Sequence, residues 1–196
     1  MKKPYHHGNL RIALLEAARA RLAEGAEAAL TLRDIASRVG VSVNATYRHF
    51  DSKEALLMEL AAQGFDALRA AMLSASAALG SAEAIEQLYA AGEAYVRFAQ
   101  QDPALFKLMF GREGRFAAYE RFDQAAEAAF AVVVERVAAV QGVAPHPIGA
   151  TKAAVAAWSL VHGFAILSIG GYLEALPEER RPNLRDVMKM LDVARS

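Results

Sequence analysis

The segment from residue 31 to residue 53 constrains the fold most, because it holds start and stop signals for two short helices in succession. Thr31 is a favourable N-cap for the first helix. Gly40 stands where that helix has to end and turn, since glycine adopts positive φ without a Cβ penalty. Ser42 is the next N-cap candidate, for a helix that we expect to reach about His49. The pattern predicts a helix-turn-helix, whose second helix enters the major groove of DNA.

Two short helices around a glycine also occur in ordinary helical proteins, so a plain helical hairpin is the alternative. The combination of both caps with the small residue Ala36, which lets the second helix pass close over the first, favours DNA binding. The polar and aromatic run that follows favours it too: Tyr47-Arg48-His49-Phe50-Asp51-Ser52-Lys53.

Side chains near the start of the second helix are expected to read base edges. These are Ser42, Val43, Asn44 and Thr46, with Arg48 one turn further on. Asn44 is able to form paired hydrogen bonds to adenine, and Val43 can touch a thymine methyl group. For Thr46 two alternatives stay open, a side chain packed inward or one that reaches a base. Phosphate contacts are expected from Tyr47, His49 and Lys53, with a hydroxyl or amide from Thr31.

The rest of the chain predicts an all-α protein of one or two domains. Its 196 residues are 55% apolar and rich in alanine, the best helix former, and no useful β-alternation occurs. The helices are expected at about 9–23, 32–39, 43–49, 52–78, 82–101, 104–110, 116–141, 148–172 and 184–194. We expect a DNA-binding domain over residues 1–55, a linking helix over 52–79 and a C-terminal helical-bundle domain over 82–196.

Charge and composition narrow the function. The net charge is zero, but residues 1–53 carry nine Lys and Arg against five acids, and the remainder has the opposite excess. A basic module joined to an acidic one fits nucleic acid at one end. The longest apolar stretch, 153–169, is interrupted by polar residues and glycine, which favours a buried helix over a membrane span. There is no cysteine, and no signal-peptide pattern at the start, so a cytoplasmic protein is the simplest expectation.

Several runs in the N-terminal segment carry a resemblance: Tyr5-His6-His7-Gly8-Asn9-Leu10, Gly40-Val41-Ser42, Tyr47-Arg48-His49-Phe50 and Lys53-Glu54-Ala55-Leu56. They resemble the DNA-binding domain of the TetR/AcrR family of transcriptional regulators. Thr46 departs from that pattern, because a more apolar residue is expected there. Further on, Trp158…His162-Gly163 resembles the signature of one C-terminal subclass, the WHG domain. Together the two resemblances cover most of the chain.

The resemblance implies a small-molecule pocket in the C-terminal domain and a homodimer. Pocket candidates are Tyr95, Phe98, Met109, Phe110, Phe122, Trp158 and His162, although core packing explains each of them as well. Their apolar and aromatic character indicates an apolar or aromatic effector. The resemblance implies that the last two long helices pack against their symmetry mates as a four-helix bundle, and small side chains such as Ala156 and Ala157 would permit this close approach. A two-fold dimer would read two half-sites of a palindromic operator in double-stranded DNA.

The sequence contains none of several common catalytic motifs. It has no Gly-x-Ser-x-Gly elbow, no phosphate-binding loop of the Walker type and no His-Glu-x-x-His, and its five histidines lack metal-site spacing. We therefore expect no catalytic residues, no metal and no cofactor. The prediction is a DNA-binding regulator, most simply a repressor released from its operator by a small molecule. A transcriptional activator and a ligand-independent helical DNA-binding protein are the alternatives.

Overall fold

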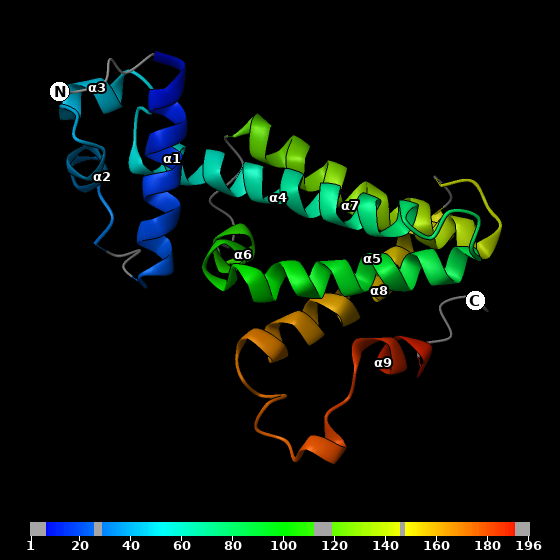
Figure 1. Ribbon diagram of the computed structural model, residues 1–196. Helices are drawn as coiled ribbons and strands as arrows, with labels where there is room; N and C mark the ends of the chain where they lie inside the picture. Colours follow the sequence, from blue (N-terminus) through cyan, green and yellow to red (C-terminus); the bar gives the residue numbers. More distant parts are fainter. Residues whose placement is uncertain (1–6, 26–28, 112–118, 146–147, 191–196) are drawn as a thin grey trace. The chain divides into compact units, whose positions relative to one another are not determined.

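The computed structural model describes residues 7–25, 29–111, 119–145 and 148–190, and within these ranges it is helical with no strand (Figure 1). This confirms the predicted all-α class. The helices are α1 (His7–Ala23), α2 (Leu32–Val39), α3 (Val43–Tyr47), α4 (Lys53–Ala77), α5 (Ala84–Gln101), α6 (Pro103–Phe110), α7 (Glu120–Gln141), α8 (Ile148–Ile169) and α9 (Leu184–Met190), with a 3₁₀ turn η1 (Glu178–Arg180) before the last.

The chain forms two compact units. One lies within residues 1–64 and 104–123, and the other lies within residues 65–103 and 124–196. The helix α6 belongs to the first unit, although the expected C-terminal domain, 82–196, would include it. The division into a DNA-binding domain over 1–55 and a C-terminal domain over 82–196 remains a functional prediction.

In the first unit, α1 packs on α2 and α2 packs on α3. Leu14 and Ala18 of α1 and Ile35 and Ala36 of α2 are completely buried, so each helix presents one apolar stripe to the other. Burying a side chain the size of leucine stabilises a fold by roughly 1.5–3 kcal/mol. The small Ala36 side chain lies in this core, as the sequence predicts.

The helix ends in this unit follow the predicted caps. The Thr31 hydroxyl accepts a hydrogen bond from the Asp34 N–H at 3.1 Å, and the Ser42 hydroxyl accepts one from the Ala45 N–H at 3.3 Å. Gly40 has φ +76°, and its N–H donates to the Ser37 carbonyl at the end of α2. These local hydrogen bonds satisfy backbone N–H and C=O groups that have no partner within the helix. They therefore fix where α2 ends and where α3 begins.

Two predicted helices are shorter in the structure. The recognition helix ends at Tyr47 rather than His49. The helix predicted over 148–172 ends at Ile169, because Gly171 takes φ +75° and the Tyr172 N–H donates back to the Leu167 carbonyl. Residues 116–118 and 191–194, which the sequence predicts to be helical, lie outside the described residues.

In the second unit, α5 packs along α8, and α9 contacts both helices (Figure 1). Gln87, near the start of α5, ties three segments together. Its backbone carbonyl accepts from the Ser76 hydroxyl of α4 at 3.0 Å, its side-chain oxygen accepts from Arg136 of α7 at 2.7 Å, and its amide donates to the Gly80 carbonyl at 3.1 Å. This partly buried network holds the ends of α4, α5 and α7 in one arrangement.

Candidate functional site

The short helix α3 and the residues that flank it carry most of the side chains predicted to contact DNA. Ser42, Asn44 and Arg48 are exposed, and the Tyr47 side chain is 51% exposed although it is large and aromatic. Val43 and His49 are half-buried. An amide, a hydroxyl and a guanidinium displayed around one short helix are the groups that bind base edges and phosphates.

Thr46 does not share this exposure. Its side chain is completely buried, and its hydroxyl oxygen has no hydrogen-bond partner among the described residues. Of the two alternatives that the sequence left open, the structure therefore has the inward one, and Thr46 leaves the set of residues that can touch a base. The reason is the helix itself, because position 46 falls on the face of α3 that packs into the core.

Thr31 and Lys53 lie at two other helix starts. Thr31 is exposed, and its hydroxyl is occupied as the N-cap of α2. Lys53 is half-buried at the first position of α4, where Ser52 caps the helix by accepting from the Ala55 N–H at 3.0 Å. A helix start with a lysine beside it favours an anion such as a phosphate. A phosphate contact from either residue stays a prediction.

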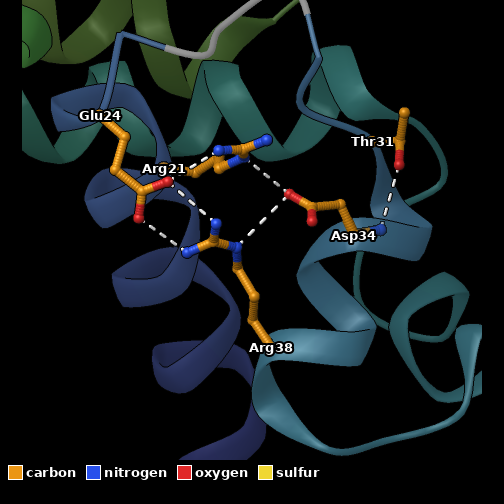
Figure 2. A network of polar contacts seen from close by, with 5 residues as sticks. All are labelled: Arg21, Glu24, Thr31, Asp34 and Arg38. Atoms are coloured by element: carbon orange, nitrogen blue, oxygen red, sulfur yellow. Dashed lines mark hydrogen bonds and ion pairs between the residues drawn. The ribbon is translucent and has the colours of Figure 1, made fainter.

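An ion-pair network fixes α1 against α2 behind this surface (Figure 2). Glu24 accepts hydrogen bonds from Arg21 at 2.7 Å and from Arg38 at 2.8 and 2.9 Å. Arg21 also donates to Asp34 at 3.0 Å, and Arg38 lies 3.6 Å from the same carboxylate. Hydrogen bonds from Arg38 and then Arg21 lower the pKa of the Glu24 carboxyl below its ordinary value. The sequence analysis missed this network, since it joins charges that lie 13 or 14 positions apart.

A cavity lies in the second unit and is lined by ten residues of α4, α5, α7, α8 and α9. Two of the predicted pocket residues, Tyr95 and Trp158, are among them. The Trp158 indole N–H donates to the Tyr95 hydroxyl at 3.2 Å, and that hydroxyl lies 2.8 Å from Nδ1 of His162. Three of the predicted side chains therefore meet in one hydrogen-bonded cluster.

Burial shifts both titratable groups of this cluster toward their neutral forms. Desolvation raises the pKa of the Tyr95 hydroxyl, against a smaller lowering effect of the Trp158 hydrogen bond. Desolvation lowers the pKa of the His162 imidazole. A neutral imidazole and a neutral phenol make a polar but uncharged cluster at the edge of an apolar cavity.

The other predicted pocket residues do not line this cavity. Phe98 is half-buried on α5, and Met109, Phe110 and Phe122 lie in the first compact unit. Met109 packs against Gly64 of α4, so closely that a Cβ atom on this glycine would lie 2.6 Å from the methionine sulfur. Residues that the sequence analysis did not select complete the cavity, among them Met72, Gly92 and Met188. A glycine in the middle of α5 was the one available signal, because it marks a close approach.

The outer face of α8 is apolar and uncovered. Val155, Ile166 and Leu167 are 40–45% exposed, whereas Ala157, which the sequence grouped with the dimer contacts, points into the cavity. Among the described helices, the stretch Gly149–Ile169 alone is long and apolar enough to cross a membrane, and 28% of the tested window is buried. One such helix is weak evidence for a membrane span. No group of three or more metal-ligating side chains occurs in the described ranges.

Comparisons with known proteins agree with this geometry. Residues 14–60 match the family model for bacterial regulatory proteins of the tetR family, and residues 88–191 match the tetracyclin repressor-like C-terminal domain. The second match covers more than half of the chain and includes the motif from Trp158 to Gly163. The comparison with curated proteins found no match.

Solved structures share the fold over nearly the whole chain. A protein of unknown function from Rhodococcus sp. RHA1 is 31% identical, with a TM-score of 0.81 and 96% of each chain covered. A tetR-family regulatory protein from Rhodococcus RHA1 is 24% identical, with a TM-score of 0.63 and 92% of this chain and 91% of that chain covered. The ketosteroid transcriptional regulator KstR2 of Mycobacterium tuberculosis is 21% identical, with a TM-score of 0.59 and coverage of 96% and 94%. The chain belongs to the TetR family of bacterial regulatory proteins and is a DNA-binding transcription regulator.

Proposed function

We propose that this regulator is a ligand-responsive repressor that binds a palindromic operator as a homodimer and leaves it when a small molecule binds the C-terminal domain. The exposed surface of α3 carries the proposal, because Asn44 and Tyr47 are accessible on it. The Ser42 cap fixes the start of this helix, and ion pairs hold α1 against α2, on which α3 packs. Contacts from Asn44 would set the choice of sequence, and contacts from Tyr47 and Lys53 would set affinity and salt dependence.

The apolar face of α8 supports the homodimer. A helix buried in one chain's core would be mostly covered, yet Val155, Ile166 and Leu167 lie open to solvent. An exposed apolar face of this kind is typical of a surface that another protein covers. A second copy packed on α8 by two-fold symmetry would give each dimer two recognition helices, which is what a palindromic operator requires. Sedimentation of the full chain at several concentrations tests this step.

The cavity supports the ligand response. The helix α4 contributes Met72 to the cavity lining and carries Lys53 at its first position. We propose that a ligand shifts α4 and with it the spacing of the two recognition helices in the dimer. A coupling of about 1–3 kcal/mol between the two sites would weaken operator binding roughly 5- to 150-fold. Because the protein acts on DNA, we also propose a cytoplasmic location.

Selection of random double-stranded DNA by the purified protein tests the DNA-binding step. We expect an enriched inverted repeat, with half-site centres about 34–36 Å apart or a multiple of that spacing. Asn44→Ala should relax one position in each half-site, whereas Tyr47→Ala should weaken all sequences alike. An enriched sequence without two-fold symmetry would contradict the dimer, and an unchanged profile for Asn44→Ala would contradict its assignment as a base contact.

The selected operator then separates repressor from activator. Placed over a promoter in a reporter strain, it should lower expression in the presence of the regulator. A gain in expression at every operator position would favour the activator alternative. Operator binding that no extract or small molecule changes would favour a ligand-independent regulator.

A further inference from the structure

We propose that α9 is a lid on the cavity, with Met188 as its plug, and that the effector is a small, uncharged, apolar molecule that takes the place of the Met188 side chain. This inference rests on the proposed ligand response, which it makes more specific.

Met188 occupies the cavity because α5 has no side chain at position 92. A Cβ atom built on Gly92 would lie 3.0 Å from the Met188 sulfur and 3.4 Å from a methyl carbon of Val161. Met188 itself is 5% exposed, although it belongs to a seven-residue helix near the end of the chain. A methionine fills irregular apolar space well and leaves it readily, since its side chain is unbranched and flexible.

Besides the buried side chains Leu184 and Met188, one arginine holds α9 on α5. Arg185 donates to Glu93 at 2.9 Å and to Glu86 at 2.5 Å, and its guanidinium lies 5.3 Å from the ring centre of Tyr89. These three partners follow one face of α5. The ion pairs are about one-third exposed, so water and salt weaken them. Because these ion pairs are weak, α9 can move away from α5 without unfolding the rest of the second unit.

The chemistry of the cavity selects the ligand class. No Asp, Glu, Lys, Arg or His is among the lining residues, and almost no polar surface faces the space. The one hydroxyl in the lining, that of Tyr95, is engaged by Trp158 and lies 2.8 Å from His162. A charged group would therefore lose its hydration without gaining a partner, which strongly opposes its entry. An apolar molecule loses nothing comparable and gains by leaving water.

The present size of the cavity requires the plug to move. The room for water-sized molecules is about 20 Å³, little more than one water needs. The surrounding space not filled by atoms is about 330 Å³ and is partly open to solvent. A ring-sized ligand therefore fits only when a side chain moves aside. Of the two methionines in the lining, Met72 belongs to the 25-residue α4, whereas Met188 belongs to the seven-residue α9 and is the one that we propose to move.

Toluene and benzoate are the probes for the test, because they have nearly the same shape and differ in charge. The fluorescence of Trp158 reports binding, since it lines the cavity and is the only tryptophan in the chain. Excitation at the red edge of its absorption avoids both probes. We expect toluene to change the emission of the full-length protein in a saturable way, and benzoate to leave it unchanged at the same concentrations.

Two methionine variants on α9 show whether the buried Met188 side chain in particular limits toluene binding, or whether any loss of a methionine from this helix has the same effect. Met188→Ala should bind toluene about tenfold more tightly than the wild type, because the ligand no longer has to displace a buried side chain. Met190→Ala is the matched control, since Met190 lies on the same helix and is 84% exposed. Gly92→Ala should bind toluene more weakly, because its methyl group takes space beside Met188. This second variant keeps the test decisive if circular dichroism shows that Met188→Ala is unfolded.

The inference is overturned if toluene leaves Trp158 fluorescence unchanged in the wild type and in the folded variants, or if benzoate binds as well as toluene. It is also overturned if Met188→Ala and Met190→Ala bind toluene alike, or if Gly92→Ala binds toluene as tightly as the wild type. Binding of the selected operator, measured by fluorescence anisotropy with and without toluene, is a separate readout. If toluene binds with the expected dependence on Met188 but leaves operator binding unchanged, the lid and its ligand class stand and the proposed ligand response fails.

Discussion

The buried threonine of the recognition helix leads to an unusual prediction, that a substitution in a DNA-binding element should stabilise the protein. Thr46 is completely buried, and its hydroxyl has no partner within the described residues. Valine has nearly the same shape and replaces the hydroxyl by a methyl group. Thr46→Val therefore removes a buried unsatisfied polar group and leaves the packing of α3 nearly unchanged.

The expected gain follows from the desolvation penalty of the hydroxyl. A buried polar group without a partner costs roughly 1–3 kcal/mol, so Thr46→Val should raise the free energy of unfolding by an amount in that range. Thr31→Val is the matched control with the opposite sign. Its hydroxyl caps α2 by accepting from the Asp34 N–H, and loss of such a cap costs about 1 kcal/mol. Urea denaturation at one fixed protein concentration, followed by far-ultraviolet circular dichroism, compares both variants with the wild type.

A lower free energy of unfolding for Thr46→Val would show that the Thr46 hydroxyl has a stabilising partner, and so would refute the prediction. A second readout tests the assignment of Thr46 to the core. Since a buried side chain cannot touch a base, the sequence selected by Thr46→Val should match that of the wild type. A change at a single operator position would show that the side chain reaches DNA.

A turn and a titratable group give two further predictions. Gly40→Ala should lower the free energy of unfolding by about 1–2 kcal/mol in urea denaturation, because alanine disfavours φ +76° and no neighbour lies within 4 Å of the added Cβ to compensate. Burial lowers the pKa of the His162 imidazole below its ordinary value of 6.5, so protons bind the unfolded state more readily than the folded state. The His162 contribution therefore leaves the free energy of unfolding unchanged above about pH 6.5 and lowers it as the pH falls below that value. Unfolding free energies at about pH 7.5 and about pH 5.5 should differ less in His162→Gln than in the wild type.

The features that the sequence predicted well are those decided within a few residues. The N-cap bonds of Thr31 and Ser42 span three residues each, and the turn at Gly40 depends on the backbone of that residue alone. Such signals are visible in a linear pattern because nothing distant competes with them. The same holds for the end of α5, where Asp102 and Pro103 stop one helix and begin the next.

The features that were missed depend on pairs far apart in the chain. Arg185 meets Glu86 across 99 positions, and Tyr95 meets His162 across 67. No local pattern distinguishes an arginine that fastens α9 from one in solvent. The same limit applies to the pocket. The choice of aromatic and apolar residues included Tyr95 and Trp158, which line the cavity, but also Met109, Phe110 and Phe122, which lie in the other compact unit.

The number of cationic side chains in the N-terminal segment does not show how many of them can bind DNA, because several already form ion pairs within the protein. Of its nine cationic side chains, Arg11 pairs with Glu59 at 2.9 Å, and Arg21 and Arg38 pair with Glu24. These three guanidinium groups already have carboxylate partners, so they release few counterions when DNA binds. The exposed Arg48 is placed differently. The sequence grouped it with the base-reading side chains, but it follows the last residue of α3, where its guanidinium can meet a phosphate instead of a base edge.

Salt dependence should therefore separate two arginines that the sequence makes equivalent. Arg48→Ala should lower the slope of log affinity against log salt concentration by about 1, as expected for one lost phosphate contact. Arg38→Ala should leave that slope unchanged and instead lower the free energy of unfolding, because Glu24 loses the stronger of its two partners. Anisotropy of the selected operator over a range of salt concentrations measures the slope for each variant. A slope that Arg38→Ala lowers as much as Arg48→Ala does would show that the ion-pair network of Figure 2 opens when the protein meets DNA. A slope that Arg48→Ala leaves unchanged would show that Arg48 meets no phosphate.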